Sequence, residues 1–271
     1  MLDEEDYAAL YAIFHDFVSH FNDSSDPEEV LETLSAMRFD HLMKYALDGF
    51  GMDYEDALKL LKAHNENLSK GEREKRNILV AAVENLIEFA VAEEYQMIEH
   101  LPDTLDEVSE EEFYAVFDRY NKGYAAVEND DVHFAMGVAA VWLTFSDTTA
   151  LTYMTQGDNK VRPWHMVLEG TSYLKREFPD WLIPPIEHGC RCFLVEEDGT
   201  HILNESNKVE RVQCKKPIEK PDFVSPVFSE SVCKGGRIFG KAHSYFQVQK
   251  RDKKRLRALT QKLKKQWLME E

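Results

Sequence analysis

Four side chains with metal-binding or nucleophilic atoms lie close together in the sequence: His165, His188, Cys190 and Cys192. Imidazole nitrogens and thiolates are donors that zinc prefers. Because alternate residues of a strand point to opposite faces, the C-x-C spacing would separate the two thiols unless the backbone bends there. The sequence therefore leaves two readings open, a zinc site or two small buried residues beside surface histidines.

The same residues raise the question of covalent catalysis. Cys190 with His165 or His188 would form a thiol–imidazole pair, but no orienting partner or oxyanion site accompanies it. The sequence contains no P-loop, dinucleotide-binding glycine pattern, H-E-x-x-H or G-x-S-x-G. We expect no catalytic residues, and an enzyme or toxin-like effector using the His165/His188/Cys190 region is the alternative.

Two arginines flank these residues and favour a structural use of the region. Arg162 precedes Pro163 and should be extended, while Arg191 should point away from its neighbouring cysteines. Arg191 could pair with Asp158 or Glu169 and pin a long loop to a hairpin. The alternative is an anion site made of both arginines. The predicted clasp comprises Asp158, Arg162, Pro163, His165, Glu169, Cys190, Arg191 and Cys192.

A third chemical feature is a basic segment near the C-terminus. An amphipathic helix there would carry its cations beside Leu256, Leu259 and Leu263. It could contact nucleic-acid phosphates without reading sequence, or it could dock on an acidic part of its own chain. Its apolar stripe is narrow for a membrane surface. The candidate phosphate-binding residues are Lys250, Arg251, Lys253, Lys254, Arg255 and Arg257.

Charge is distributed unevenly along the 271 residues, whose net charge is −18. Residues 1–156 hold 34 acids and 10 bases, a balance of −24, and residues 157–271 hold 16 acids and 22 bases, a balance of +6. The acidic N-terminus does not resemble a signal peptide, so we expect the cysteines to be reduced and a disulfide framework to be absent. The apolar run Phe134–Phe145 is too short to span a bilayer, and no membrane partner is expected.

The elements that position these residues fall into two regions with different sequence patterns. Up to about residue 150 the apolar spacing is helical, with helix starts at Asp26-Pro27, Asp53, Ser69 with Glu72, and Ser109 with Glu112. We expect one helix to run towards residue 37 and another to follow, ended by two glycines, and a further helix over 131–145. Beyond residue 155 prolines and glycines impose turns. A strand over 190–197 should turn at Asp198-Gly199 and return over 200–203, and Ser244 should open the final helix.

The segment from Gly157 to His165, together with Leu168-Glu169-Gly170 and Pro184–Cys192, resembles the phage Mu F-like minor head proteins. That family shows a D-x-R-V-R-P-x-H-like start, an L-D-G-like turn and a later P-P and C-R-C. Lys160 and Glu169 stand where the pattern has Arg and Asp. Some relatives carry a cysteine pair near the position of Arg162–His165 that looks like a metal site, so at least one presumed ligand is missing here.

The resemblance covers about 90 residues, from roughly Thr155 to Tyr245. We predict an α+β protein: an acidic helical domain over 1–154, a small loop-rich α+β domain with a short antiparallel sheet over 155–245, and a basic C-terminal helix over 246–271. The resemblance implies a structural minor capsid protein of head morphogenesis in a tailed phage or prophage. It would bind the portal or other capsid proteins and packaged DNA, in the virion or the host cytoplasm. A free-standing, sequence-independent nucleic-acid-binding protein is a second alternative.

Overall fold

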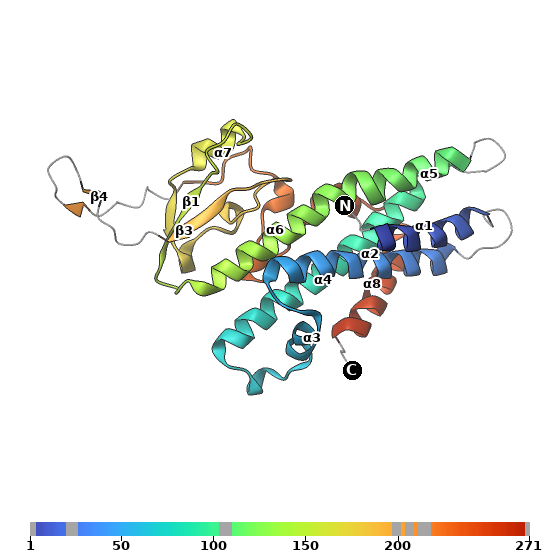
Figure 1. Cartoon of the computed structure of the whole chain (residues 1–271), viewed down its shortest axis with the longest axis horizontal. Coiled ribbons are helices and arrows are strands. Elements are labelled where there is room, and N and C mark those ends of the chain that lie inside the picture. The colour runs from blue at the N-terminus through green and yellow to red at the C-terminus, as the bar shows by residue number, and fades with distance from the viewer. Residues whose placement is uncertain are drawn as a thin grey trace.

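A computed structural model describes residues 4–19, 27–102, 110–196, 202–203, 209–210 and 218–268. These residues are mostly helical and include a three-stranded antiparallel sheet, which confirms the predicted α+β fold. Figure 1 shows the sheet at one end of the molecule and a bundle of long helices at the other. None of the described helices is long and apolar enough to cross a membrane.

The first part of the chain forms the helical bundle. Its elements are α1 (Glu4–Ser19), α2 (Pro27–Phe50), α3 (Tyr54–Lys62), α4 (Lys70–Glu99), α5 (Glu110–Asp118), a π-helical turn (Arg119–Tyr124) and α6 (Ala125–Thr144). Asp53 caps α3 by accepting from the Asp56 N–H, and Ser69 with Glu72 forms the predicted capping box of α4. The helix start at Asp26 and the cap at Ser109 lie outside the described residues.

The long helix α2 differs from the expectation of two successive helices. It runs without interruption because no glycine or proline lies between Pro27 and Gly49. It packs against both α4 and α6. A Cβ atom on Gly49 would lie 2.1 Å from the backbone oxygen of His133, so glycine is needed there for the close approach of α2 and α6.

The small sheet has the order β2–β1–β3, with β1 (Ala150–Met154) between β2 (Ser172–Leu174) and β3 (Phe193–Glu196). The predicted domain boundary after residue 154 falls between β1 and the strands that it pairs with. The predicted hairpin is wrong: β4 (Ile202–Leu203), on its return strand, belongs to a separate sheet in which it pairs with β5 (Val209–Glu210) and not with β3. Residues 198 and 199 of that hairpin lie outside the described part.

The remaining segments run back along the helices. After α7 (Pro163–Leu168), 3-10 turns at Pro226–Phe228, Val232–Lys234 and Ser244–Phe246 lead to α8 (Lys253–Leu268). The final helix therefore begins later than expected, and Ser244 opens only a short turn. α8 packs on α4 with Leu256, Leu259 and Leu263 buried, and Phe239 stacks on Phe89 of α4 at 4.2 Å. A single hydrophobic cluster thus joins the helices and the sheet.

Candidate metal centre

The predicted clasp lies where α7 meets the loop that precedes β3. Arg162 is extended before Pro163, as expected, and Pro163 is the first residue of α7. This turn brings His165 into the interior, where its side chain is only 3% exposed. The loop residues Cys190 and Cys192 are buried beside it. α7 and the loop before β3 therefore bring one imidazole and two thiols together.

The three donor groups have the spacing of a metal site. His165 Nδ1 lies 3.4 Å from Cys192 Sγ and 3.9 Å from Cys190 Sγ. One donor atom from each residue can be chosen such that all three lie within 4.8 Å of one another. Tetrahedral zinc, with Zn–S about 2.3 Å and Zn–N about 2.1 Å, places sulfur and nitrogen about 3.6 Å apart. The two measured distances bracket that value, so this donor set fits zinc.

The C-x-C spacing does not separate the thiols, because the strand predicted over 190–197 begins only at Phe193. Residues 190–192 precede β3 and are not part of a strand, so the two thiols need not alternate between faces. Both sulfurs lie near the same imidazole nitrogen. Arg191, between them, is exposed to solvent.

Glu187 orients the imidazole from its other side. Its Oε2 lies 3.1 Å from His165 Nε2, and the same oxygen accepts a hydrogen bond from Trp164 Nε1 at 2.9 Å. Arg162 Nε lies 3.4 Å away and makes an ion pair with this carboxylate. A carboxylate on the second nitrogen fixes the tautomer of a metal-binding histidine and leaves Nδ1 for the metal. Sequence reasoning missed Glu187, although it lies within the motif segment.

His188 does not join the cluster, which corrects one of the four predicted metal ligands. Its Nδ1 lies 2.7 Å from Asp131 Oδ2 of α6, and the Gly189 N–H donates to Asp131 Oδ1, also at 2.7 Å. Its ring packs edge-on against Phe228 at 4.9 Å. Asp131 is buried and ties the loop to the helical bundle. No local pattern predicts this contact, because the two residues are far apart along the chain.

The protonation equilibria of the thiols are shifted in opposite directions. Hydrogen bonding with Cys190 outweighs burial and lowers the pKa of the Cys192 thiol to about 7, helped by Tyr153 and Arg162. The same hydrogen bond, together with burial, raises the pKa of the Cys190 thiol. The Tyr153 hydroxyl is close to both thiols and buried, yet it has no hydrogen-bond partner of good geometry among the described residues. The pair therefore holds one thiolate readily, as metal binding requires.

The arginines of the clasp are engaged with acceptors of the protein. Arg191 Nη2 donates to Asp158 Oδ1 at 2.9 Å, which is one of the two pairings considered from the sequence. Arg162 Nη2 donates to the backbone oxygen of His188 at 2.7 Å. Glu169 instead accepts from the Thr155 hydroxyl and backbone N–H. Both guanidinium groups are thus partly used in fixing the loops, which weakens the alternative of an anion site.

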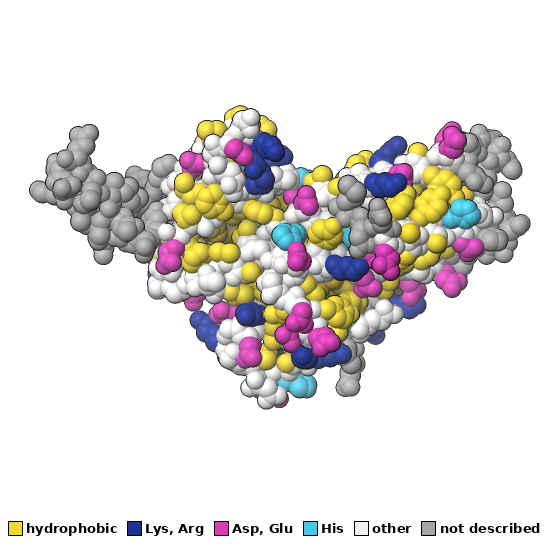
Figure 2. Space-filling model, in the orientation of Figure 1, with side chains coloured by type: hydrophobic (Ala, Val, Ile, Leu, Met, Phe, Trp, Pro, Cys, Tyr) yellow, Lys and Arg dark blue, Asp and Glu magenta, His cyan; other side chains and the backbone are white. Residues whose placement is uncertain are grey.

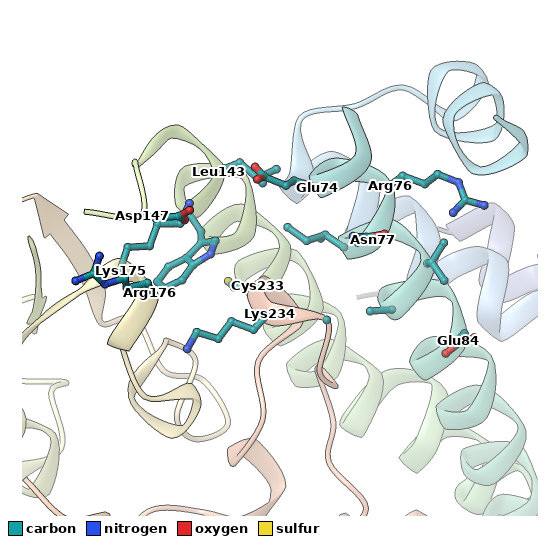
Figure 3. Close-up of a pocket in the computed structure, with 15 residues that line it drawn as sticks. Glu74, Arg76, Asn77, Glu84, Leu143, Asp147, Lys175, Arg176, Cys233 and Lys234 are labelled. Carbon is teal, nitrogen blue, oxygen red and sulfur yellow. The ribbon is translucent and has the colours of Figure 1, made fainter. Parts of the chain in front are cut away.

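The space at the centre is small. The cavity lined by His165, Cys190 and Cys192 has a volume of about 10 Å³, which is about the space for one water molecule or ion. A larger hollow of about 570 Å³ lies between α4 and the turn that carries Cys233 and Lys234, and Figure 3 shows its charged rim. That hollow is lined by none of the predicted site residues.

The six predicted phosphate-binding residues of the C-terminal segment divide into two groups. Arg251 pairs with Asp252 at 3.0 Å and with Glu99 at 3.7 Å, and Arg255 lies 3.8 Å from Glu28. The others are exposed and make no ion pair within the described part of the chain. They are Lys250, Lys253, Lys254 and Arg257. α8 therefore docks on its own bundle and still presents free cations.

A buried polar network in the bundle was missed entirely. The Arg38 guanidinium, which is fully buried, donates to Glu93 at 2.7 Å, to Asn129 at 2.7 Å and to Glu128 at 2.9 Å. Adjacent Glu94 is buried without a hydrogen-bond partner among the described residues. The adjacent residues Glu93 and Glu94, inside the apolar run of α4, were the signal in the sequence from which this network could have been predicted.

Comparison with known proteins adds no assignment. No family model, no curated protein and no solved structure matches this chain. The likeness of its motifs to the Mu F-like proteins therefore stays a prediction from the sequence.

Proposed function

We propose that this chain is a structural minor capsid protein of head morphogenesis in a tailed phage or prophage, and that it works by binding. The R-P-x-H and C-R-C motifs support the assignment to the Mu F-like family. The observation that supports binding is the closed clasp, in which the motif residues surround a cavity of only about 10 Å³. A rival enzyme or toxin-like effector needs His165, His188 and Cys190 to converge on an open cleft, whereas His188 faces Asp131.

A surface beside the clasp fits a protein partner such as the portal or another capsid protein. α7 exposes Trp164, Met166 and Val167, of which Val167 is 70% exposed. Figure 2 shows apolar side chains at the tip where α7 lies. Clustered exposed apolar side chains mark interaction sites more often than single ones do. We assign the partner contact to this tip.

The assignment is tested on particles induced from the source strain. We expect mass spectrometry of density-gradient-purified heads to find this protein beside the portal, and deletion of its gene to lower the yield of infectious particles. Complementation with Met166→Ser/Val167→Ser should fail, while Val127→Ser, at an exposed apolar position on α6, should restore the yield. Absence from particles together with a normal yield after deletion would refute the assignment.

We further propose that His165, Cys190 and Cys192 bind zinc, because three suitable donors meet with tetrahedral spacing. Zinc would cross-link α7 to the loop before β3. Elemental analysis of purified protein should find about one zinc per chain, which Cys190→Ser and Cys192→Ser should each lose. Cys233→Ser is the matched control, because Cys233 is also buried but lies outside the cluster. Metal-free wild-type protein with unchanged thermal stability would exclude this site.

A further inference from the structure

A groove between α4, residues 237–248 and α8 has a strongly basic lining. Its volume is about 490 Å³. One carboxylate, Glu88, faces five cations, so the lining carries four positive charges in excess. The cations come from two segments, and they are Arg237, Lys241, Lys253, Arg257 and Lys264.

The single carboxylate does not neutralise the groove. Arg237 Nη1 and Lys264 Nζ each lie 2.7 Å from an oxygen of Glu88, so two cations share one negative charge. Lys241, Lys253 and Arg257 are exposed and have no ion pair with any residue that the structure describes. On the rest of α8, Lys262 pairs with Glu32 at 2.6 Å and Arg255 lies 3.8 Å from Glu28, whereas Lys254 has no ion pair with a residue that the structure describes. Self-neutralisation therefore accounts for only part of the charge of α8 and leaves the groove with an excess of cations.

The groove also offers apolar and aromatic surface. Phe246 and Val248 are partly exposed in its lining, which buried Val91, Ala92 and Leu256 complete. Phe246 lies among the cations, with the Arg237 guanidinium 5.0 Å from its ring centre. Cations that follow a phosphate chain, combined with a ring on which bases can pack, characterise sites for single-stranded nucleic acid. A duplex presents its phosphates outside and its bases inside, so it would leave this apolar lining unused.

We propose that this groove binds a single strand of nucleic acid, with its phosphates on Lys241, Lys253 and Arg257 and a base or sugar against Phe246. The inference goes beyond the proposed function and does not depend on it, since it follows from the lining of the groove alone. It also moves the predicted contact from the tail as a whole to one face of α8.

The test measures fluorescence anisotropy of labelled oligo-dT of about 20 nucleotides with the full chain, from about 50 to 300 mM NaCl. We expect a slope of log K against log salt of about −2 to −3, because three or four phosphate contacts contribute about −0.7 each. Lys253→Glu/Arg257→Glu should weaken binding about tenfold or more. Lys254→Glu/Lys265→Glu changes the net charge equally on the same helix but outside the groove, and should bind nearly as wild type.

A second variant distinguishes packing of bases against Phe246 from attraction by the positive charges alone. Phe246→Ala should weaken binding of oligo-dT and leave the weak, salt-sensitive binding of a duplex of equal length unchanged. Thermal unfolding of each variant checks that the fold persists. Absence of oligo-dT binding at the lowest salt, equal losses in the two double variants, or a preference for the duplex would each overturn the proposal. Absence of the protein from particles together with a normal yield after deletion would refute the head assignment and leave this result unaffected.

Discussion

At the scale of single residues, the buried network around Arg38 concentrates charge where water is excluded. Arg38 is the only cation bonded to Glu93 and Glu128 among the described residues, and these carboxylates raise the pKa of its guanidinium although burial opposes this. Removing one partner of a buried charged group leaves the others without compensation, which costs far more than removing a surface pair. The network therefore makes specific predictions.

Arg38→Met keeps the apolar stem and removes the charge. We expect the free energy of unfolding at pH 7 to fall by about 3–5 kcal/mol. The loss should shrink at pH 5 as Glu128 becomes protonated, because burial raises the pKa of this carboxyl. Urea unfolding followed by circular dichroism at both pH values measures this. Arg176→Met, at an exposed site beside Glu177, should cost less than about 0.5 kcal/mol. Equal losses in the two variants would contradict the prediction.

Glu94 predicts how stability depends on pH. Burial, and next the charge of Glu93, raise the pKa of Glu94 to about 8 from its ordinary value of 4.5. Between these values the folded chain holds a proton that the unfolded chain releases, so this group lowers stability as pH rises. Glu94→Gln removes the titration. The stability of the variant relative to wild type should therefore rise from pH 5 to 8, by up to about 1.4 kcal/mol per unit. A pH-independent difference in urea unfolding would refute this.

Residue types were predicted better than residue partners. The residue types of the R-P-x-H and C-R-C elements pointed to His165, Cys190 and Cys192, and these three meet in the structure. His188 goes to Asp131 instead, because that choice depends on how the loop docks on α6, which no local pattern records. The Arg38 network was not predictable for the same reason, since it needs the relative register of three helices.

At the scale of elements, Asp131 is the principal polar tie between α6 and the loop before β3. It accepts from His188 and from the Gly189 backbone, and both contacts are 2.7 Å long. The loop that carries Cys190 and Cys192 is thereby held against the bundle as well as against α7. The candidate metal centre depends on both attachments.

Asp131→Asn should weaken this tie, because an amide can accept with only one of its two terminal atoms. We expect the free energy of unfolding to fall by about 2–3 kcal/mol and hydrogen exchange to accelerate over residues 187–192. Asp130→Asn removes the same charge from the adjacent, exposed position and should change neither quantity. Unchanged exchange in Asp131→Asn would show that the loop is held by other contacts.

Elements with local signals were predicted and those set by pairing were not. The capping box at Ser69 and the cap at Asp53 predict the starts of α4 and α3 directly. β1 carries no such signal: its five residues follow a helix, and only its pairing with β2 and β3 makes it a strand. The same reason explains the wrong hairpin, since the partner of β3 lies about 40 residues earlier in the chain.

At the scale of the whole molecule, one hydrophobic core contains residues from all three of the predicted parts. α8 lies on α4, Trp267 packs edge-on against Phe39 of α2 at 4.9 Å, and the segment before α8 packs on α4 as well. We therefore expect the described part of the chain to unfold as one cooperative unit. The acidic half and the basic end are complementary surfaces within one fold.

Leu259→Asp tests how α8 contributes to that unit. Leu259 is buried on α4, and a carboxylate there is either desolvated or forces the helix to undock. We expect a lower melting temperature and faster hydrogen exchange over residues 253–268. Ala258→Asp adds the same charge at the exposed neighbouring position and should preserve both. Equal behaviour of the two variants would mean that α8 is not held by this apolar face.

The docking of α8 has a consequence for synthesis on the ribosome. Every element that α8 covers is made before it, so the apolar strip of α4 that receives Leu256, Leu259 and Leu263 stays open while the nascent chain grows. Such a surface is a natural substrate for chaperones during translation. Slowing the translation of the codons that follow residue 246 should thus prolong chaperone association, without altering the mature protein.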